Sequence, residues 1–367
     1  YGLTVEKKII DAVAVIANEN RYHPVCDFLN ALQWDGTERI RFCLHRFLGS
    51  DTDDYTYEAL KLFLLGAISR AFKPGCKFEV MLCLVGGQGA GKSSFFRLLA
   101  VNDDWFSDDL KKLDDENVYR KMQGHWIIEM SEMIATANAK SIEEIKSFLS
   151  RQKETYKIPY ETHPADRKRQ CVFGGSSNTL DFLPLDRTGN RRFVPVMVYP
   201  ERAEVHILAD EQASREYINQ MWAEAMEIYR SGNFRLRFSP AMNDYLKAHQ
   251  KDFMPEDTKA GQILDYLERY SGSIVCSKQL YKEALGHDYD EPKQWELREI
   301  NDIMNNAVTG WRAFSNPRYF PEPYRRQKGW ERIRNDNEPD NSMDGFQEIP
   351  TEEMEQLGLP EEWLKQK

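Results

Sequence analysis

Long apolar runs are missing from this sequence of 367 residues. No stretch approaches the roughly 20 residues that a helix needs to cross a bilayer, and residues 1–21 read as a helix of mixed charge rather than a signal peptide. We therefore expect a cytoplasmic protein with no membrane partner. Internal repeats and low-complexity tracts are also missing. The chain begins at Tyr1 instead of Met, so we expect a piece of a longer protein, with another activity in the remaining part.

Cysteine is scarce and is not arranged for metal or disulfide chemistry. The six cysteines include no Cys-x-x-Cys pair, and their spacing suits neither a zinc site nor a disulfide framework. We expect reduced or buried thiols. The net charge of −10 argues against a protein that coats DNA over its whole surface. It leaves room for a local basic channel, because phosphate binding depends on where the positive charges lie.

Four short apolar runs indicate the fold class. Residues 80–85, 126–128, 171–173 and 193–196 are continuous apolar segments, as in strands buried on both faces of a parallel sheet. Helical patterns separate the first three, and strands that alternate with helices indicate an α/β layered domain. We expect this core over residues 73–250, after a helical N-terminal unit over residues 1–72.

The C-terminal part reads as a separate domain and a tail. Residues 255–334 contain three helix candidates followed by strand candidates, an order that indicates a winged-helix-like domain. The basic and aromatic segment 318–330 is consistent with two interpretations that we weigh about equally. The domain either binds duplex DNA or is a packing module with a polar surface. Residues 335–367 are rich in Asp, Glu and Pro, and we expect an acidic, flexible tail there.

One motif carries the chemistry of the α/β core. Directly after the first apolar run, the sequence matches Gly-x-x-x-x-Gly-Lys-Ser, a phosphate-binding loop (P-loop). In this motif backbone N–H groups and a helix N-terminus face the phosphates. Lys92 is expected to reach the β and γ phosphates of ATP, and Ser93 to hold Mg²⁺. The predicted nucleotide-binding residues are Gly86, Gly87, Gln88, Gly89, Ala90, Gly91, Lys92, Ser93 and Ser94.

The next apolar run ends in two carboxylates, Glu129 and Glu132. Glu129 is expected to bind Mg²⁺, and Glu132 to polarise the attacking water, although the two roles can be exchanged. An apolar strand that ends in acid is common, and both residues would also suit a solvated helix start. The acidic strand end is better evidence for a nucleotide site here, because it follows a P-loop in the sequence.

Polar residues at two further strands complete the predicted site. Asn178 follows the third apolar run, where an amide would sense the γ-phosphate; a plain strand-ending turn is the alternative. Arg191 and Arg192 precede the fourth run. They are either surface charges or an arginine finger, given to the ATP of a neighbouring subunit to stabilise transition-state charge. The finger hypothesis requires a homo-oligomer.

A basic cluster precedes the third run and is interleaved with Tyr156 and Tyr160. It reads as a hairpin that grips single-stranded DNA, with tyrosines available to stack on bases; a solvated charged loop is the alternative. The predicted DNA-binding residues are Lys146, Lys153, Lys157, Arg167, Lys168 and Arg169.

In their order these motifs resemble the virulence-associated protein E family of phage and mobile-element replication modules, which is related to superfamily 3 helicases of the AAA+ class. The matching stretches are residues 86–93, 126–132, 145–151, 156–160, 174–178 and 188–193. The resemblance implies a ring, with a hexamer as the expected size, that couples ATP hydrolysis to movement on single-stranded DNA. It also implies a primase domain or partner upstream. The Glu-x-x-Glu spacing departs from the two adjacent carboxylates of related proteins.

The sequence therefore predicts an ATP-dependent DNA helicase or translocase, with single-stranded DNA as partner and origin duplex DNA as a further candidate. One alternative is an ATPase that remodels or loads a protein partner, which would not need the basic cluster. Another is an ATP-operated signalling or defence switch, with slow turnover and no stimulation by DNA. A small-molecule kinase fits less well, because no acceptor-binding lid is evident.

Overall fold

The computed structural model describes residues 6–20, 22–110, 113, 118–131, 139–156, 165–185 and 190–333, without the side chains of 18 and 139–141. The chain divides into two compact units, Tyr1–Asp257 and Thr258–Lys367. The predicted tail at residues 335–367 lies outside the described residues. No helix of the described residues is both long enough and apolar enough to cross a membrane.

The first unit alternates helices and strands. In chain order its elements are α1 (Glu6–Glu19), α2 (Pro24–Ala31), α3 (Ile40–Leu48), α4 (Asp54–Phe72), β1 (Met81–Val85), α5 (Lys92–Leu99), η1 (Asp103–Trp105), β2 (Phe106–Ser107), α6 (Val118–Lys121), β3 (Ile127–Ser131), α7 (Ala139–Ser150), β4 (Lys153–Tyr156), β5 (Ala165–Lys168), β6 (Val172–Ser177), β7 (Phe193–Met197), η2 (Pro200–Arg202), α8 (Glu211–Ser231), α9 (Pro240–His249) and η3 (Gln250–Phe253).

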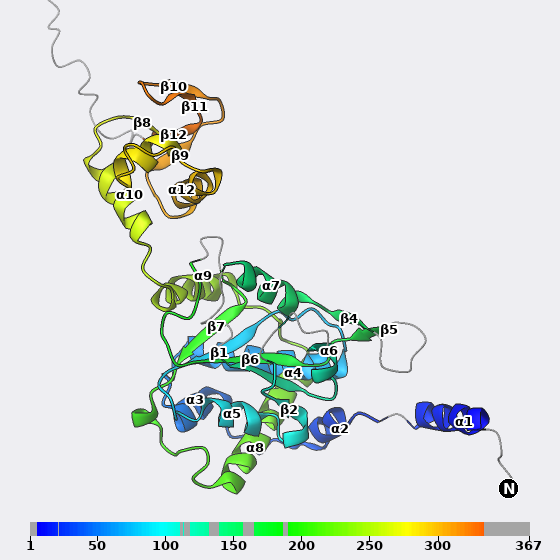
Figure 1. Cartoon of the computed structure of the whole chain (residues 1–367). Coiled ribbons are helices and arrows are strands. Elements are labelled where there is room, and N and C mark those ends of the chain that lie inside the picture. The colour runs from blue at the N-terminus through cyan, green and yellow to red at the C-terminus, as the bar shows by residue number, and fades with distance from the viewer. Residues whose placement is uncertain are drawn as a thin grey trace, which may run out of the picture. The chain divides into compact units, whose positions relative to one another are not determined.

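A five-stranded parallel sheet has the strand order β2–β3–β6–β1–β7. It forms the centre of this unit, where Figure 1 labels β1, β6 and β7. The four apolar runs of the sequence are its strands β1, β3, β6 and β7, which confirms the α/β class with a central parallel sheet. β6 lies between β1 and β3. Because all five strands are parallel, their carboxyl ends lie at one edge, where the P-loop follows β1.

Helices cover both faces of the sheet, and alternate residues of β1 serve the two faces. Leu82 and Leu84 share one hydrophobic core with α2, α3, α4, α5 and α8. Met81, Cys83 and Val85 share the other core with α6 and α7. The result is a three-layer sandwich, which explains why the strands read as continuous apolar runs rather than alternating ones.

A glycine in β6 lets the P-loop helix approach the sheet. A Cβ atom at Gly174 would lie only 2.4 Å from a ring carbon of Phe96, a buried residue of α5. Gly174 is also the register partner of Glu129 in β3. The close packing of α5 on the middle strand thus brings the start of that helix near Glu129.

The predicted helical unit at residues 1–72 does not have a separate core. Fourteen of the nineteen residues of α4 are buried, and α2, α3 and α4 share their hydrophobic core with β1. A helix buried on nearly every side needs the sheet as a packing partner. The contacts place these helices in the same unit as the sheet.

The second unit contains α10 (Thr258–Arg269), β8 (Ile274–Cys276), α11 (Ser277–Gln279), the π-helical turn η4 (Leu280–Ala284), α12 (Gln294–Asn306), β9 (Trp311–Ala313), β10 (Arg318–Phe320), β11 (Arg325–Gln327) and β12 (Gly329–Arg332). An antiparallel sheet has the order β8–β12–β9, and β10 pairs with β11 as a hairpin. The helices pack a small core around Ile263, Leu280 and Ile303. The winged-helix assignment stays a prediction.

Candidate active site

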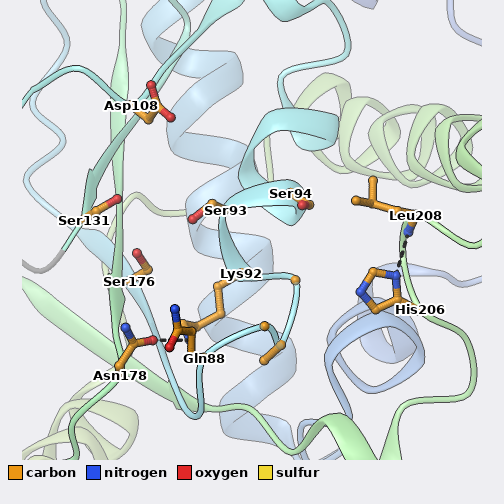
Figure 2. Close-up of a pocket in the computed structure, with 13 residues that line it drawn as sticks. Gln88, Lys92, Ser93, Ser94, Asp108, Ser131, Ser176, Asn178, His206 and Leu208 are labelled. Atoms are coloured by element: carbon orange, nitrogen blue, oxygen red, sulfur yellow. Dashed lines mark hydrogen bonds between the residues drawn. The ribbon is translucent and has the colours of Figure 1, made fainter.

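A pocket of about 770 Å³ opens at the carboxyl edge of the sheet (Figure 2). The P-loop, β3 and β6 supply most of its wall, and two segments distant in sequence complete it. The lining residues are Gln88, Gly89, Ala90, Gly91, Lys92, Ser93, Ser94, Asp108, Ser131, Ser176, Asn178, His206 and Leu208.

The predicted nucleotide-binding residues form a loop between β1 and α5. Gly89 and Gly91 have φ angles of +80° and +79°, a region that L side chains avoid and glycine adopts at little cost. Gly91 is the N-cap of α5. This geometry turns the loop back over the start of the helix, where free backbone N–H groups and the helix dipole favour an anion.

Lys92 lies inside this loop and is only 7% exposed. Its Nζ donates to the carbonyl oxygens of Gly86 and Gly87, each at 2.7 Å, and to Oδ1 of Asn178 at 3.0 Å. The predicted sensor residue and the predicted catalytic lysine are therefore in direct contact.

Glu129 is fully buried below the loop. Its Oε1 accepts hydrogen bonds from Oγ of Ser93 at 2.8 Å and from Oγ of Ser176 at 2.5 Å. Its Oε2 is buried without a hydrogen-bond partner among the described residues. A buried carboxylate oxygen in this state carries a large desolvation cost, which a cation or a donor from a ligand would offset.

These groups fit Mg²⁺, which prefers carboxylate and hydroxyl oxygens and keeps several water or phosphate ligands. Ser93 and the free Oε2 of Glu129 would hold the ion. Nowhere in the described part of the chain do three or more His, Cys, Asp or Glu side chains gather around a possible metal position. Phosphate oxygens and water would therefore have to supply the other ligands.

The predicted partner of Glu129, Glu132, lies outside the described residues. Ser131, the residue before it, is exposed and lines the pocket. Asp108 also lines the pocket, and sequence reasoning missed it. It follows β2, the strand beside β3, and its exposed carboxylate has no hydrogen-bond or ion-pair partner within the described part of the chain. Because β2 is only two residues long, no apolar run pointed to it.

His206 and Leu208 are the other pocket residues that sequence reasoning missed (Figure 2). They come from the segment between η2 and α8, well beyond the recognised motifs. A lone His and a lone Leu in a connecting segment carry no motif signal, so only the fold brings them to the P-loop.

Arg191 and Arg192 lie at the opposite edge of the sheet. The carbonyl of Arg192 accepts from the N–H of Met81, at the start of β1. A strand advances about 3.3 Å per residue, so five residues of β1 place roughly 15 Å between this edge and the P-loop. Arg191, 69% exposed, pairs with Glu79 at 3.2 Å, and Nε of Arg192 donates to Oγ of Ser150 at 2.9 Å. Neither arginine lies at the P-loop of its own chain.

Arg191 also lines a second pocket of about 960 Å³ at that edge. Cations outnumber anions among its charged lining side chains. The cations are Lys77, Arg191, Arg235, Arg237 and Lys247, and the anions are Glu79 and Asp244. Among the described residues, the side chains of Lys77, Arg235, Arg237 and Lys247 have no hydrogen-bond or ion-pair partner, so positive charge accumulates there in an otherwise acidic chain.

The predicted DNA-binding segment contains the antiparallel hairpin β4–β5. Its connecting residues 157–164, including Lys157 and Tyr160, lie outside the described residues. Lys153 pairs with Asp166, and Lys168 is exposed. The guanidinium of Arg167 lies over the ring of Tyr156 at 5.2 Å.

Two residues predicted to bind DNA are buried instead. The side chain of Arg169 is 1% exposed; it pairs with buried Glu154 and donates to the carbonyl oxygen of Phe148. The side chain of Lys146 is 5% exposed and lies 3.1 Å from Glu143. Arg169 thus belongs to an internal ion pair, whereas Lys146 pairs within α7 with Glu143, whose own side chain is 70% exposed. The burial of these two cations argues against direct DNA contact by either, and the DNA-binding role of the segment stays a prediction.

Comparison with known proteins gives a family match over this region. The model of the virulence-associated protein E-like domain matches residues 29–255, more than half of the chain. A search of curated proteins gives no match. Three solved apo structures of the NrS-1 C-terminal region are similar. In each comparison the aligned region covers 83% of this chain and 78% of the solved chain. The sequence identities are 12%, 13% and 13%, and the TM-scores are 0.47, 0.49 and 0.46.

Proposed function

This chain belongs to the virulence-associated protein E-like family, and we propose that it is an ATP-hydrolysing P-loop enzyme that moves along DNA as a replication helicase or translocase. The contact of Lys92 with Asn178, beside the bond from Ser93 to Glu129, is the observation that carries the ATPase proposal. Together these two contacts bring the P-loop, the end of β6 and Glu129 of β3 to one place, as hydrolysis of a γ-phosphate requires.

The residues of this chain would act as follows. Backbone N–H groups of the loop bind the β-phosphate, and Lys92 bonds the β and γ phosphates. The ammonium group of Lys92 has three N–H donors, and we propose that a phosphate oxygen replaces Asn178 as one of its acceptors. When Asn178 is released, its amide becomes available to the γ-phosphate and to the attacking water. Mg²⁺, when bound by Ser93 and Glu129, neutralises phosphate charge.

The attacking water needs a carboxylate to orient it and take its proton. Glu129 is buried and bonded to Ser93 and Ser176, which suits the metal role rather than the water role. We assign the water to Glu132, the next acidic residue in the sequence.

We further propose a homo-oligomeric ring in which Arg191 and Arg192 act on the ATP of the neighbouring subunit. Their place at the edge opposite the P-loop supports this, because head-to-tail contacts between identical subunits bring opposite edges together. The cations of the second pocket would add to the positive charge presented to that ATP. The ring would grip single-stranded DNA with the β4–β5 hairpin.

The first test is the ATPase rate with and without single-stranded DNA, at low and moderate salt, with Lys92→Ala as control. Strong stimulation by DNA that falls with salt supports the translocase. Hydrolysis that depends on Lys92 but ignores DNA rejects the DNA part and leaves the ATPase. A remodelling ATPase or a signalling switch is then the better proposal, in line with the burial of Lys146 and Arg169.

A further inference from the structure

The segment between η2 and α8 closes one side of the P-loop pocket and is firmly anchored. The N–H of Val205 donates to the carbonyl oxygen of Arg46 at 3.1 Å. Ile207 is fully buried, and its carbonyl oxygen accepts from Oγ of Ser214 at 2.8 Å. The backbone of the segment is therefore tied to α3 on one side and to α8 on the other.

The neighbours of Ile207 in the sequence, His206 and Leu208, face the pocket instead of the core. His206 and Leu208 are exposed and line the pocket, and Figure 2 shows both across from the P-loop, with Leu208 near Ser94. Leu208 is 43% exposed. An apolar side chain at the rim of a polar pocket is ready to pack against a flat, apolar part of a ligand.

His206 presents a hydrogen-bond donor toward the loop. Its Nδ1 accepts from the N–H of Leu208 at 3.3 Å, so the neutral ring carries its proton on Nε2. A Cβ atom at Gly91 would lie 3.9 Å from that Nε2. The donor therefore lies beside the N-cap of α5, within reach of a group bound at the loop.

The position of His206 and Leu208 along the pocket indicates which part of a bound nucleotide they would contact. Asn178, Glu129 and Ser176 mark the γ-phosphate and metal end of the site. Ser94 lies one residue further into α5, on the side of Leu208 (Figure 2). A nucleotide with its terminal phosphate at Asn178 must run past Ser94, so its sugar and base reach His206 and Leu208.

We propose that His206 and Leu208 form the nucleoside-binding wall of the site. Leu208 packs against the face of the base, and Nε2–H of His206 donates to an oxygen at the sugar and α-phosphate end. The inference rests on the proposed ATPase function and adds nucleoside recognition to it. Neither residue takes part in the chemical step, so each contributes binding that is equal in the ground and transition states.

The test compares ATP with inorganic tripolyphosphate, which lacks the nucleoside. Binding of both to the full chain is measured by calorimetry for the wild type, His206→Ala, His206→Gln and Leu208→Ala. Leu185→Ala is the matched control, because Leu185 is 42% exposed and does not line the pocket. We expect the Kd for ATP to rise roughly three- to tenfold in both alanine variants, with tripolyphosphate unchanged. His206→Gln, which keeps a donor, recovers part of the loss.

Steady-state kinetics should agree, with a raised KM for ATP and a wild-type kcat. Unchanged ATP binding in both alanine variants, in a protein whose ATP binding needs Lys92, overturns the inference alone. Equal losses for ATP and tripolyphosphate also overturn it, because the residues would then act on the phosphates. A wild-type protein that binds neither compound overturns the ATPase proposal together with this one.

Discussion

Nζ of Lys92 donates a hydrogen bond of 3.0 Å to Oδ1 of Asn178, a residue 86 positions later in the chain. Asn178 follows β6, the strand between the P-loop strand β1 and the acidic strand β3. The lysine thus reaches across to the middle strand, and the amide lies where the γ-phosphate of a bound ATP would end. Under the proposed function, this contact would link phosphate binding by Lys92 to the position of the Asn178 amide.

Asn178→Ala should therefore impair hydrolysis more than binding. We expect near wild-type affinity for ATP and a kcat lowered by roughly 10²-fold, the usual effect of removing one donor that acts in the transition state. Lys92→Ala should abolish turnover. Calorimetry with ATP and a steady-state ATPase assay separate the two effects. A wild-type kcat in Asn178→Ala would remove the sensor role.

The sequence was sufficient to predict the class of the sheet and the Gly-rich loop that follows its first apolar strand. A Gly-rich loop between a buried strand and a helix is a local pattern, and four strands show as unbroken apolar runs. The strand order was beyond reach, because pairing between β1, β6 and β3 depends on contacts far apart in sequence. His206 and Leu208 were missed for the same reason, since folding alone brings them to the loop. Asp108 was missed because the strand before it, β2, is only two residues long.

The basic cluster shows a different limit. Counting cations at residues 146–170 predicted a DNA surface, but a count does not say which charges are paired inside the protein. Arg169 pairs with Glu154, fifteen residues earlier, and the partner is only evident once β4 and β5 form a hairpin. Lys146 lies on the buried side of α7, which packs against the sheet.

The arginine-finger hypothesis predicts rescue between two inactive variants. Arg192→Ala keeps its P-loop and should bind ATP without hydrolysing it. Lys92→Ala keeps its arginines but lacks a working loop. Random assembly of equal amounts should restore about a quarter of the wild-type ATPase rate, the fraction of interfaces that combine an intact loop with an intact arginine.

The same assay with Arg191→Ala in place of Arg192→Ala shows which arginine acts. Arg191 is the more exposed of the two, and its pair with Glu79 is open to solvent. A mixture that stays as inactive as its components, while size-exclusion chromatography shows mixed oligomers, would contradict the hypothesis for both arginines.

Charge reversal at Lys168, an exposed residue of β5, tests whether the β4–β5 hairpin binds DNA. Lys168→Glu should weaken binding to single-stranded DNA and reduce the salt slope of log K by about one, because one phosphate contact is lost. The measurement is a fluorescence-anisotropy titration at several salt concentrations. Lys7→Glu, an exposed lysine of α1, serves as the matched control. An unchanged slope in Lys168→Glu would exclude this strand from the DNA interface.

Substitution of Glu129, Glu132 and Asp108 in turn should show which acid binds Mg²⁺ and which acts on the attacking water. Glu129→Gln should raise the Mg²⁺ concentration needed for half-maximal activity, because Glu129 is the buried acid bonded to Ser93. Glu132→Gln should lower kcat by roughly 10²–10⁴-fold, as expected for a lost general base, with ATP affinity retained. Asp108→Asn should keep at least half of the activity. If Asp108→Asn instead shows the large loss in kcat, the water role moves from Glu132 to Asp108.

His249 should make the first unit less stable in mild acid. Its ring packs against Tyr55, Tyr245 and Phe253, with centroids 5.0, 5.9 and 5.0 Å away. Burial lowers its pKa below the ordinary 6.5, against the opposing effect of nearby Asp252, Asp53 and Asp51. The unfolded chain therefore takes up a proton first as the pH falls. The stability contribution is complete above about pH 6.5 and is lost between that value and the lower folded pKa.

His249→Phe removes this titration and keeps an aromatic ring. The free energy of unfolding, from urea denaturation at pH 7.5 and 5.5, should fall more in the wild type than in His249→Phe. The excess is at most about 1.4 kcal/mol per pH unit. His287→Phe in the second unit is the matched control and should leave the pH dependence of the first unit as in the wild type. An equal fall in the wild type and His249→Phe would mean that the imidazole is as easily protonated in the folded protein as in the unfolded chain.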